Sequence, residues 1–219
     1  MAHPAPARLG HGTTALGLVL GFVPLFAFSI IADRLAANGV AWSALIAFVI
    51  TVLALAEGYR RHAPRMLNLA SLILFAAVMV AGFAGGPGVD RWLYEWGRPL
   101  VGVVLGLFVL ATAPVFPFTA EYARRDVPRE YWHSPTFLHI NRVLSGAWGL
   151  AIVIIGLLSL LATALGAFAI DAGSPHLDEL LLRWVLPIAV LWLTIHLTFT
   201  YPDRVTGRTP TAGHHEEAR

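Results

Sequence analysis

Six long runs of apolar residues, separated by short polar segments, dominate the chain. They lie near Thr14–Ala32, Val40–Ala56, Met66–Gly85, Pro99–Phe118, Val143–Ile170 and Trp184–Tyr201. Each approaches the roughly 20 residues that a helix needs to cross the hydrocarbon core of a bilayer. Because that core offers no water, the backbone groups of each run must bond within the run, which favours helices. The pattern predicts an all-α polytopic membrane protein with six transmembrane helices.

The composition agrees with this prediction, because the chain is far more apolar than a soluble domain. Hydrophobic residues make up 57% of its 219 residues and charged residues only 13%, whereas soluble domains carry about 25% charged residues. Six spans joined by short loops use nearly all of the chain. We therefore expect a single transmembrane domain over residues 1–219, with flexible cytoplasmic tails at 1–12 and 203–219.

Arginine is distributed unevenly between the two sides of the predicted bundle. With six spans, one side holds both termini and the two loops 57–65 and 119–142, and it carries Arg8, Arg60, Arg61, Arg65, Arg124, Arg125, Arg129, Arg142, Arg204, Arg208 and Arg219. The other side carries only Arg34, Arg91, Arg98 and Arg183. Because cytoplasmic loops are enriched in basic residues, the first side is predicted to be cytoplasmic, with the N- and C-termini inside.

The interiors of the predicted spans contain no Asp, Glu, Arg or Lys. Ionisable residues inside a membrane mark ion and proton pathways, so this pattern disfavours pumps, ion-coupled transporters and voltage sensors. His196 is the only histidine well inside a span. We expect it to be a hydrogen-bonded polar tip on a packed helix, since a haem site needs paired ligands. The sequence predicts no enzyme, no cofactor and no metal site.

The longest stretch between apolar runs is the segment 119–142, which we call the collar. It mixes arginines, acids and aromatic residues at the predicted cytoplasmic interface. A structural role would be to fix the depth of the helices, with Glu121, Asp126 and Glu130 pairing with the arginines. A functional role would be to bind lipid head groups or a partner protein. The candidate binding residues are Arg124, Arg125, Arg129, Trp132, Asn141, Arg142 and Trp148.

The fifth helix is predicted to start before the membrane. Ser134 followed by Pro135 has the pattern of an N-cap residue and a proline in the first helical position. Beyond them, Asn141, Ser145 and Trp148 follow one another at helical spacing and share one face. An unsatisfied amide is costly at the membrane entry. Asn141 is therefore expected to hydrogen-bond a neighbouring helix end or the collar backbone, with Trp148 packed below it.

Pairs of small residues four positions apart recur in the spans and predict close helix contacts. They are Gly17 and Gly21, Gly102 and Gly106, and Ala162 and Gly166. Such contacts form either within one chain or along a dimer seam. A glycine-rich stretch at 85–88 is predicted to be a turn that ends the third helix.

A short internal echo links two of the spans. Residues 24–29 read Pro-Leu-Phe-Ala-Phe-Ser, and residues 114–119 read Pro-Val-Phe-Pro-Phe-Thr. In a three-plus-three arrangement the two halves would have opposite topology, as in transporters built from inverted repeats.

Three motifs occur in order over roughly residues 23–202. They are Val23-Pro24-Leu25-Phe26 in the first span, Trp96-Gly97-Arg98-Pro99 before the fourth, and Trp132-x-x-Pro135-x-Phe137-x-x-x-Asn141-Arg142-x-x-x-x-x-Trp148-Gly149 entering the fifth. In these features the chain resembles the intracellular septation protein A family of bacterial inner-membrane proteins and its uncharacterised relatives. The resemblance implies a multi-pass protein of the bacterial inner membrane that maintains the envelope or takes part in division through contacts rather than catalysis.

Two functions remain open from the sequence. The first is a membrane scaffold or envelope-maintenance protein that binds partners or lipids. The second is a small transporter or lipid-handling protein with a site between the helices, which a polar cavity at mid-bilayer would favour. The expected partners are membrane lipids, anionic ones included, and either other membrane proteins or further copies of the chain. Nucleic acid is not expected, since the net charge is only +2.

Overall fold

The computed structural model describes residues 22–32, 39–60, 66–124, 127–168 and 180–207. Within these ranges every regular element is a helix, which confirms the all-α prediction. Five helical segments are long and apolar enough to cross a membrane, as a multi-pass membrane protein requires: Gly39–Arg60, Met66–Ala84, Gly86–Thr112, Pro135–Gly166 and Leu181–Thr206. The first predicted span is described only from Phe22 onward. A total of six spans therefore stays a prediction.

The helical segments follow one another with short connections. They are α2 (Val23–Ala32), α3 (Gly39–Arg60), α4 (Met66–Ala84), α5 (Gly86–Trp92), η1 (Leu93–Gly97), α6 (Arg98–Thr112), α7 (Phe118–Ala123), η2 (Arg129–Tyr131), α8 (Pro135–Phe168), η3 (Leu181–Val185) and α10 (Leu186–Thr206). The segments η1 and η3 are π-helical turns that continue into α6 and α10, and η2 is a single 3₁₀ turn.

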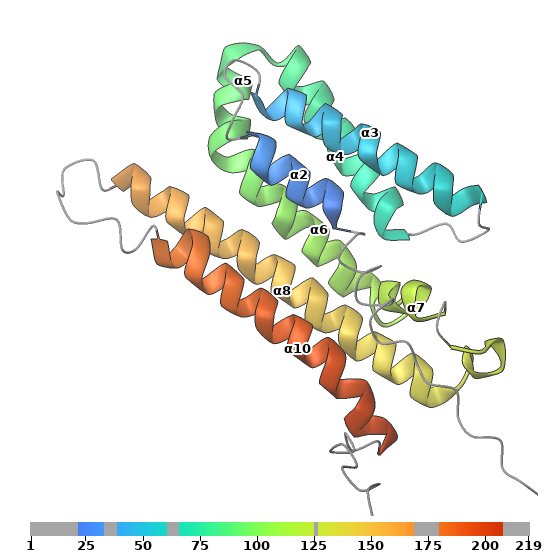
Figure 1. Ribbon diagram of the computed structural model, residues 1–219. Coiled ribbons are helices and arrows are strands. Elements are labelled where there is room, and N and C mark those ends of the chain that lie inside the picture. The colour runs from blue at the N-terminus through green and yellow to red at the C-terminus, as the bar shows by residue number, and fades with distance from the viewer. Residues whose placement is uncertain (1–21, 33–38, 61–65, 125–126, 169–179, 208–219) are drawn as a thin grey trace, which may run out of the picture.

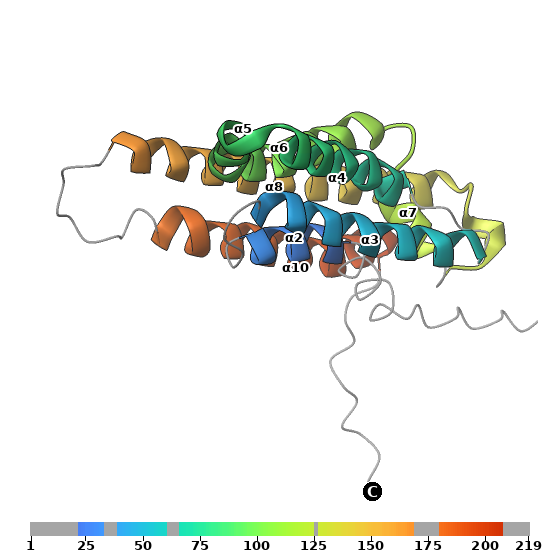
Figure 2. The same cartoon turned by 90° about the horizontal axis from the view of Figure 1, so that it is seen from above.

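The helices lie in two layers, with α2, α3 and α10 in one and α4, α5, α6 and α8 in the other (Figure 2). The helix α3 packs against α2 and α4, α6 packs along α8, and α8 packs against α10. Consecutive long helices run in opposite directions, so α3, α6 and α10 end at the side where α4 and α8 begin (Figure 1). We call this side the collar end, because it carries α7 and η2.

The close contact between α6 and α8 depends on glycine. A β-carbon at Gly106 would lie 2.8 Å from the backbone nitrogen of Val153 and 2.9 Å from the carbonyl oxygen of Gly149. On the α8 side, a β-carbon at Gly156 would lie 2.9 Å from the backbone nitrogen of Val103. These distances are shorter than a carbon atom tolerates, so the two backbones approach as closely as glycine allows. Gly106 of the predicted pair therefore serves packing within the chain.

The other two small-residue pairs do not add a close contact of this kind. Gly17 and Gly21 lie outside the described residues. Ala162 is buried, but a β-carbon at Gly166 would meet nothing within 4 Å.

Aromatic side chains fill the interior between the layers. Phe22 stacks on Trp148 with ring centroids 5.2 Å apart and meets Phe118 edge-on at 5.9 Å. Nearer the opposite end, Phe28 of α2 packs on Phe75 of α4 at 5.4 Å, and both are fully buried. Such ring contacts contribute beyond the area that they bury. They tie α2 to α4, α7 and α8.

At two proline-bearing helix ends the structure differs from the predicted spans. The helix α6 ends at Thr112 rather than Phe118, because Pro114 and Pro117 have no N–H to continue the helix. In contrast, α10 continues past Pro202 to Thr206 and ends at Gly207, whose φ of 68° is left-handed. The first four residues of the predicted C-terminal tail are therefore helical.

A proline also explains each π-helical turn. Arg98 N–H donates to the carbonyl of Leu93, and Leu186 N–H donates to the carbonyl of Leu181, five residues back in both cases. The next residue in each case is a proline, which cannot donate and whose ring would clash with the carbonyl four residues back. The wider turn relieves that clash. As a result, residues 86–98, which lie between the third and fourth predicted spans, are helical.

The turn predicted at residues 85–88 is confirmed in part. The helix α4 ends at Ala84, and Gly86 has a φ of 69° that reverses the chain. Arg98 then reaches back across this end of the bundle, where its guanidinium donates to the carbonyl of Ser29 at 2.9 Å. A cation in this position stabilises the carbonyl end of α2.

The echo between residues 24–29 and 114–119 is not a structural repeat. Residues 24–29 are helical throughout as part of α2. Residues 114–117 form a turn after α6, and only Phe118 and Thr119 belong to α7. The similarity in sequence is therefore not matched by a similarity in local structure.

Candidate functional site

A buried cluster of hydroxyl groups joins α7 to α8, and Thr119 lies at its centre. The Thr119 hydroxyl donates to the carbonyl of Asn141 at 2.9 Å and lies 2.9 Å from the Ser145 hydroxyl. The Thr119 N–H donates to the same Ser145 oxygen at 3.2 Å. All three residues are at most 3% exposed. Buried hydrogen bonds of this kind are costly to lose, so the cluster fixes α7 against the start of α8.

The side chain of Asn141 bonds the collar backbone, as predicted, and it does so within its own helix. Its side-chain amide donates to the carbonyl of Phe137 in its own helix, at 2.8 Å. The contact with α7 is made by its backbone carbonyl, which accepts from Thr119. The predicted shared face is confirmed, because Asn141, Ser145 and Trp148 are all buried. Trp148 also donates from its indole N–H to the Thr198 hydroxyl of α10 at 3.0 Å.

The start of α8 is as the sequence predicts. The Ser134 hydroxyl accepts a hydrogen bond from the Phe137 N–H at 3.2 Å, and the helix begins at Pro135. This satisfies one of the amide groups that have no partner within the helix. The cap sets the position from which the following polar residues of α8 project.

Trp132 organises the exposed part of the collar. Its indole N–H donates to the carbonyl of Val127 at 2.8 Å, which holds the ring in place. The guanidinium groups of Arg124 and Arg129 lie 5.4 and 5.6 Å from the ring centroid. A cation at this distance from an indole ring is attracted by it. The collar thus presents two arginines on one fixed aromatic ring.

One collar acid stabilises a neighbouring helix. A carboxylate oxygen of Glu121 accepts a hydrogen bond from the backbone N–H of Met66 at 3.2 Å. Met66 is the first residue of α4, where a negative charge is favourable. Among the described residues, Arg124, Arg129 and Arg142 form no ion pair with a carboxylate. The pairing of collar arginines with collar acids that belongs to the structural role is therefore not seen for these three.

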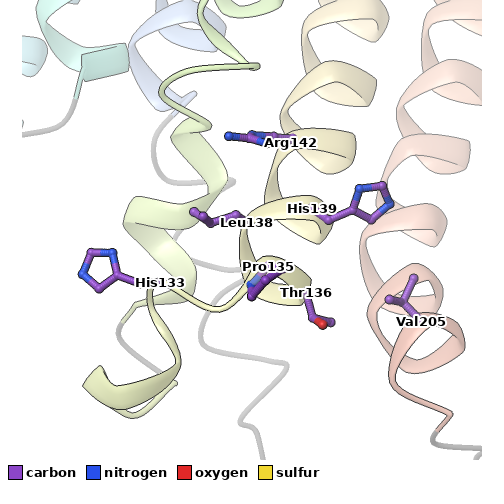
Figure 3. Close-up of a pocket in the computed structure, with 7 residues that line it drawn as sticks. All are labelled: His133, Pro135, Thr136, Leu138, His139, Arg142 and Val205. Carbon is purple, nitrogen blue, oxygen red and sulfur yellow. The ribbon is translucent and has the colours of Figure 1, made fainter.

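An open hollow of about 620 Å³ lies on the first turns of α8 (Figure 3). In Figure 3, His139 points toward α10, whereas His133 and Arg142 point away from it. His139 lies 3.1 Å from the Tyr201 hydroxyl, which bridges α8 and α10. None of the described lining residues is acidic. They are His133, Pro135, Thr136, Leu138, His139, Arg142 and Val205.

The seven candidate residues fall into three groups. Arg124, Arg129 and Arg142 are exposed, and Trp132 is half-buried between the first two. Asn141 and Trp148 are interior residues that hold helices together. Arg125 lies outside the described residues. The cationic surface therefore comprises three arginines, Arg124, Arg129 and Arg142, together with the Trp132 ring that holds the first two.

Sequence analysis missed Thr119, although it connects the collar to α8. Its partners Asn141 and Ser145 lie 22 and 26 residues away in the chain. A lone threonine next to a phenylalanine gives no signal for contacts at that distance in the chain. The two histidines that line the hollow, His133 and His139, were not among the candidate residues either.

Comparison with known proteins finds no match among family models, curated proteins or solved structures. The resemblance to the septation protein A family therefore stays a prediction. Within the described ranges no three His, Asp or Glu side chains converge to hold a metal ion.

Proposed function

We propose that this chain is a multi-pass scaffold of the bacterial inner membrane that holds anionic lipid head groups on its cytoplasmic collar. Both termini face the cytoplasm, and the scaffold serves envelope maintenance or division, as the resemblance to the septation protein A family implies. The single observation that carries the lipid proposal is the placement of Arg124 and Arg129 on Trp132, exposed and without a carboxylate partner among the described residues.

The chemistry of this arrangement fits a phosphate group. Guanidinium groups offer several N–H donors in a planar fork that matches phosphate oxygens. Because the Trp132 ring already positions both arginines, less side-chain freedom is lost when a head group binds. Each cation near an anionic membrane surface contributes about 1 kcal/mol. Arg142, next to the hollow on α8, adds a third cation at the same end of the bundle.

The packed interior supports a scaffold over a transporter. The stacked rings of Phe22 and Trp148, the contact of Phe28 with Phe75 and the close α6–α8 glycine contact fill space between the helices that a transporter would need for a substrate cavity. The hollow of about 620 Å³ opens at the collar end instead. A rigid bundle with an exposed cationic end is suited to binding at the membrane surface.

Removing the two stacked arginines should release bound lipid. The double variant Arg124→Gln, Arg129→Gln loses two cations, and we expect its affinity for anionic lipid to fall by about 2 kcal/mol, or roughly thirtyfold. The measurement is the amount of phosphatidylglycerol that remains with the purified protein, determined by lipid mass spectrometry.

The matched control is Arg91→Gln, Arg183→Gln, which removes two exposed arginines from the other end of the bundle. This control should retain as much phosphatidylglycerol as the wild type. Equal lipid loss in both double variants would show a general effect of charge and would overturn the collar site. Unchanged retention of phosphatidylglycerol in the Arg124→Gln, Arg129→Gln variant would also overturn the collar site.

The orientation is tested by reporter fusions. We expect fusions after Ala63 and after Ala212 to report a cytoplasmic location, and a fusion after Gly88 to report an external one. The physical reason is the excess of arginine at the collar end, which disfavours its translocation. An external signal after Ala212 would mean an odd number of spans and would contradict the six-span topology.

A further inference from the structure

The helix α10 lies at the edge of the bundle and is the least covered of the long helices. Only 6% of its most apolar stretch is buried, against 33–39% in the other four candidate spans. Its main contacts are with α8 and with its own preceding turn η3 (Figure 1). Lipid chains can surround apolar side chains, so low burial alone does not indicate a protein partner.

The outward side of α10 nevertheless carries an ordered stripe. Its residues follow one another three or four positions apart, so they lie on one face of the helix. This face is opposite to Thr194 and Thr198, which lie toward α8. The stripe consists of exposed side chains: Leu181, Val185, Ile188, Trp192, His196 and Phe199.

Two rings with polar N–H groups lie in the middle of this apolar stripe. Trp192 is 65% exposed, and the exposed imidazole of His196 stacks on it at 5.5 Å with an interplanar angle of 10°. In the part of the chain that the structure describes, neither ring forms a hydrogen bond. His196 is therefore not the satisfied tip of a packed helix that sequence analysis expects. Hydrocarbon offers no acceptor, so a donor facing lipid at mid-span is costly.

We propose that a second copy of this chain covers the stripe, with the two α10 helices packed in parallel around a two-fold axis along the membrane normal. A two-fold axis brings the same surface of both copies together, so His196 meets its counterpart. Neutral imidazole has one N–H donor and one nitrogen acceptor. The pair is therefore self-complementary, whereas lipid chains provide neither group. Spacing of three and four residues matches the seam of parallel helix pairs, and polar side chains hold membrane helices together.

The chain contains no cysteine, so single cysteines give a clean test. Phe199→Cys and Ile188→Cys place a thiol on the stripe and leave His196 intact. In native membranes, mild oxidation should cross-link both variants into dimers. The control is Leu53→Cys on α3, which is 65% exposed and lies seven residues from the collar end of its helix, as Phe199 does. Cross-linking of the stripe variants no faster than that of Leu53→Cys would overturn the proposal.

A second measurement tests the role of the imidazole. His196→Leu should weaken dimerisation by roughly three- to twentyfold, the range expected for interhelical hydrogen bonds in membranes. His196→Gln keeps a donor and an acceptor and should restore part of the affinity. Dimer fractions follow from light scattering in mild detergent, and the thermal midpoint of the monomer checks that each variant is folded. Equal dimer fractions in wild type and His196→Leu would show that lipid or an unrelated protein covers this face.

Discussion

Gly106→Leu should lower the thermal midpoint of the protein in detergent by roughly 2–12 °C, since overpacking typically costs about 1–3 kcal/mol and each kcal/mol shifts the midpoint of a chain of this length by about 2–4 °C. The new side chain would have to occupy space that already holds the backbone of α8. Even a β-carbon at this position would lie 2.8 Å from the Val153 nitrogen and 2.9 Å from the Gly149 oxygen. Backbone atoms cannot move aside by rotation of a side chain. The α6 and α8 helices would separate, and the contacts along their interface would weaken.

The neighbouring glycine of the same pair provides a matched control. A β-carbon at Gly102 would lie 3.8 Å from the nearest atom, the α-carbon of Gly156, which is ordinary contact. Gly102→Ala should therefore leave the midpoint near that of the wild type, whereas Gly106→Ala should lower it. Equal midpoints for the two alanine variants would mean that α6 and α8 are farther apart than described.

The sequence predicted the helical segments well because their signal is length and apolarity, which do not depend on contacts. It predicted their ends less well, because ends depend on local backbone chemistry. Pro114 and Pro117 stop α6 before the apolar run ends, whereas Pro202 does not stop α10. Both π-helical turns, before Pro99 and Pro187, also escaped the hydrophobic pattern. Apolarity predicts which residues lie in lipid. It does not predict the backbone hydrogen bonds that end or widen a helix.

The candidate site was predictable where its parts are close in sequence. Ser134 caps α8 at a spacing of three residues, which a local pattern reveals. The stacking of Arg124 and Arg129 on Trp132 depends on how the collar folds, which composition does not indicate. His196 shows another limit of prediction from the sequence. In a span that is apolar on all sides, periodicity does not distinguish the face toward the bundle from the face toward lipid.

Thr119→Val should loosen the collar while leaving the charge of the protein unchanged. Valine has nearly the same shape as threonine but no hydroxyl, so the Asn141 carbonyl loses the donor that it has at 2.9 Å. The buried Ser145 hydroxyl also loses the Thr119 hydroxyl as its partner at 2.9 Å, and leaving a buried polar group unsatisfied costs about 1–3 kcal/mol. If the collar opens locally, hydrogen exchange of its amides should speed up by roughly five- to hundredfold. The measurement is exchange over residues 119–141, followed by mass spectrometry.

The control for this change is Thr163→Val on α8, whose hydroxyl donates to the Ser159 carbonyl of its own helix at 3.1 Å. It should leave collar exchange at the wild-type rate, since it joins no two segments. The double variant Arg124→Gln, Arg129→Gln separates the two roles of the collar. It should lose anionic lipid while keeping native protection at Thr119, because the hydroxyl cluster is buried and contains no charge. Native protection in Thr119→Val would show that aromatic packing around Phe118 alone holds α7 in place. Lost protection in the arginine variant would show instead that bound lipid is what orders the collar.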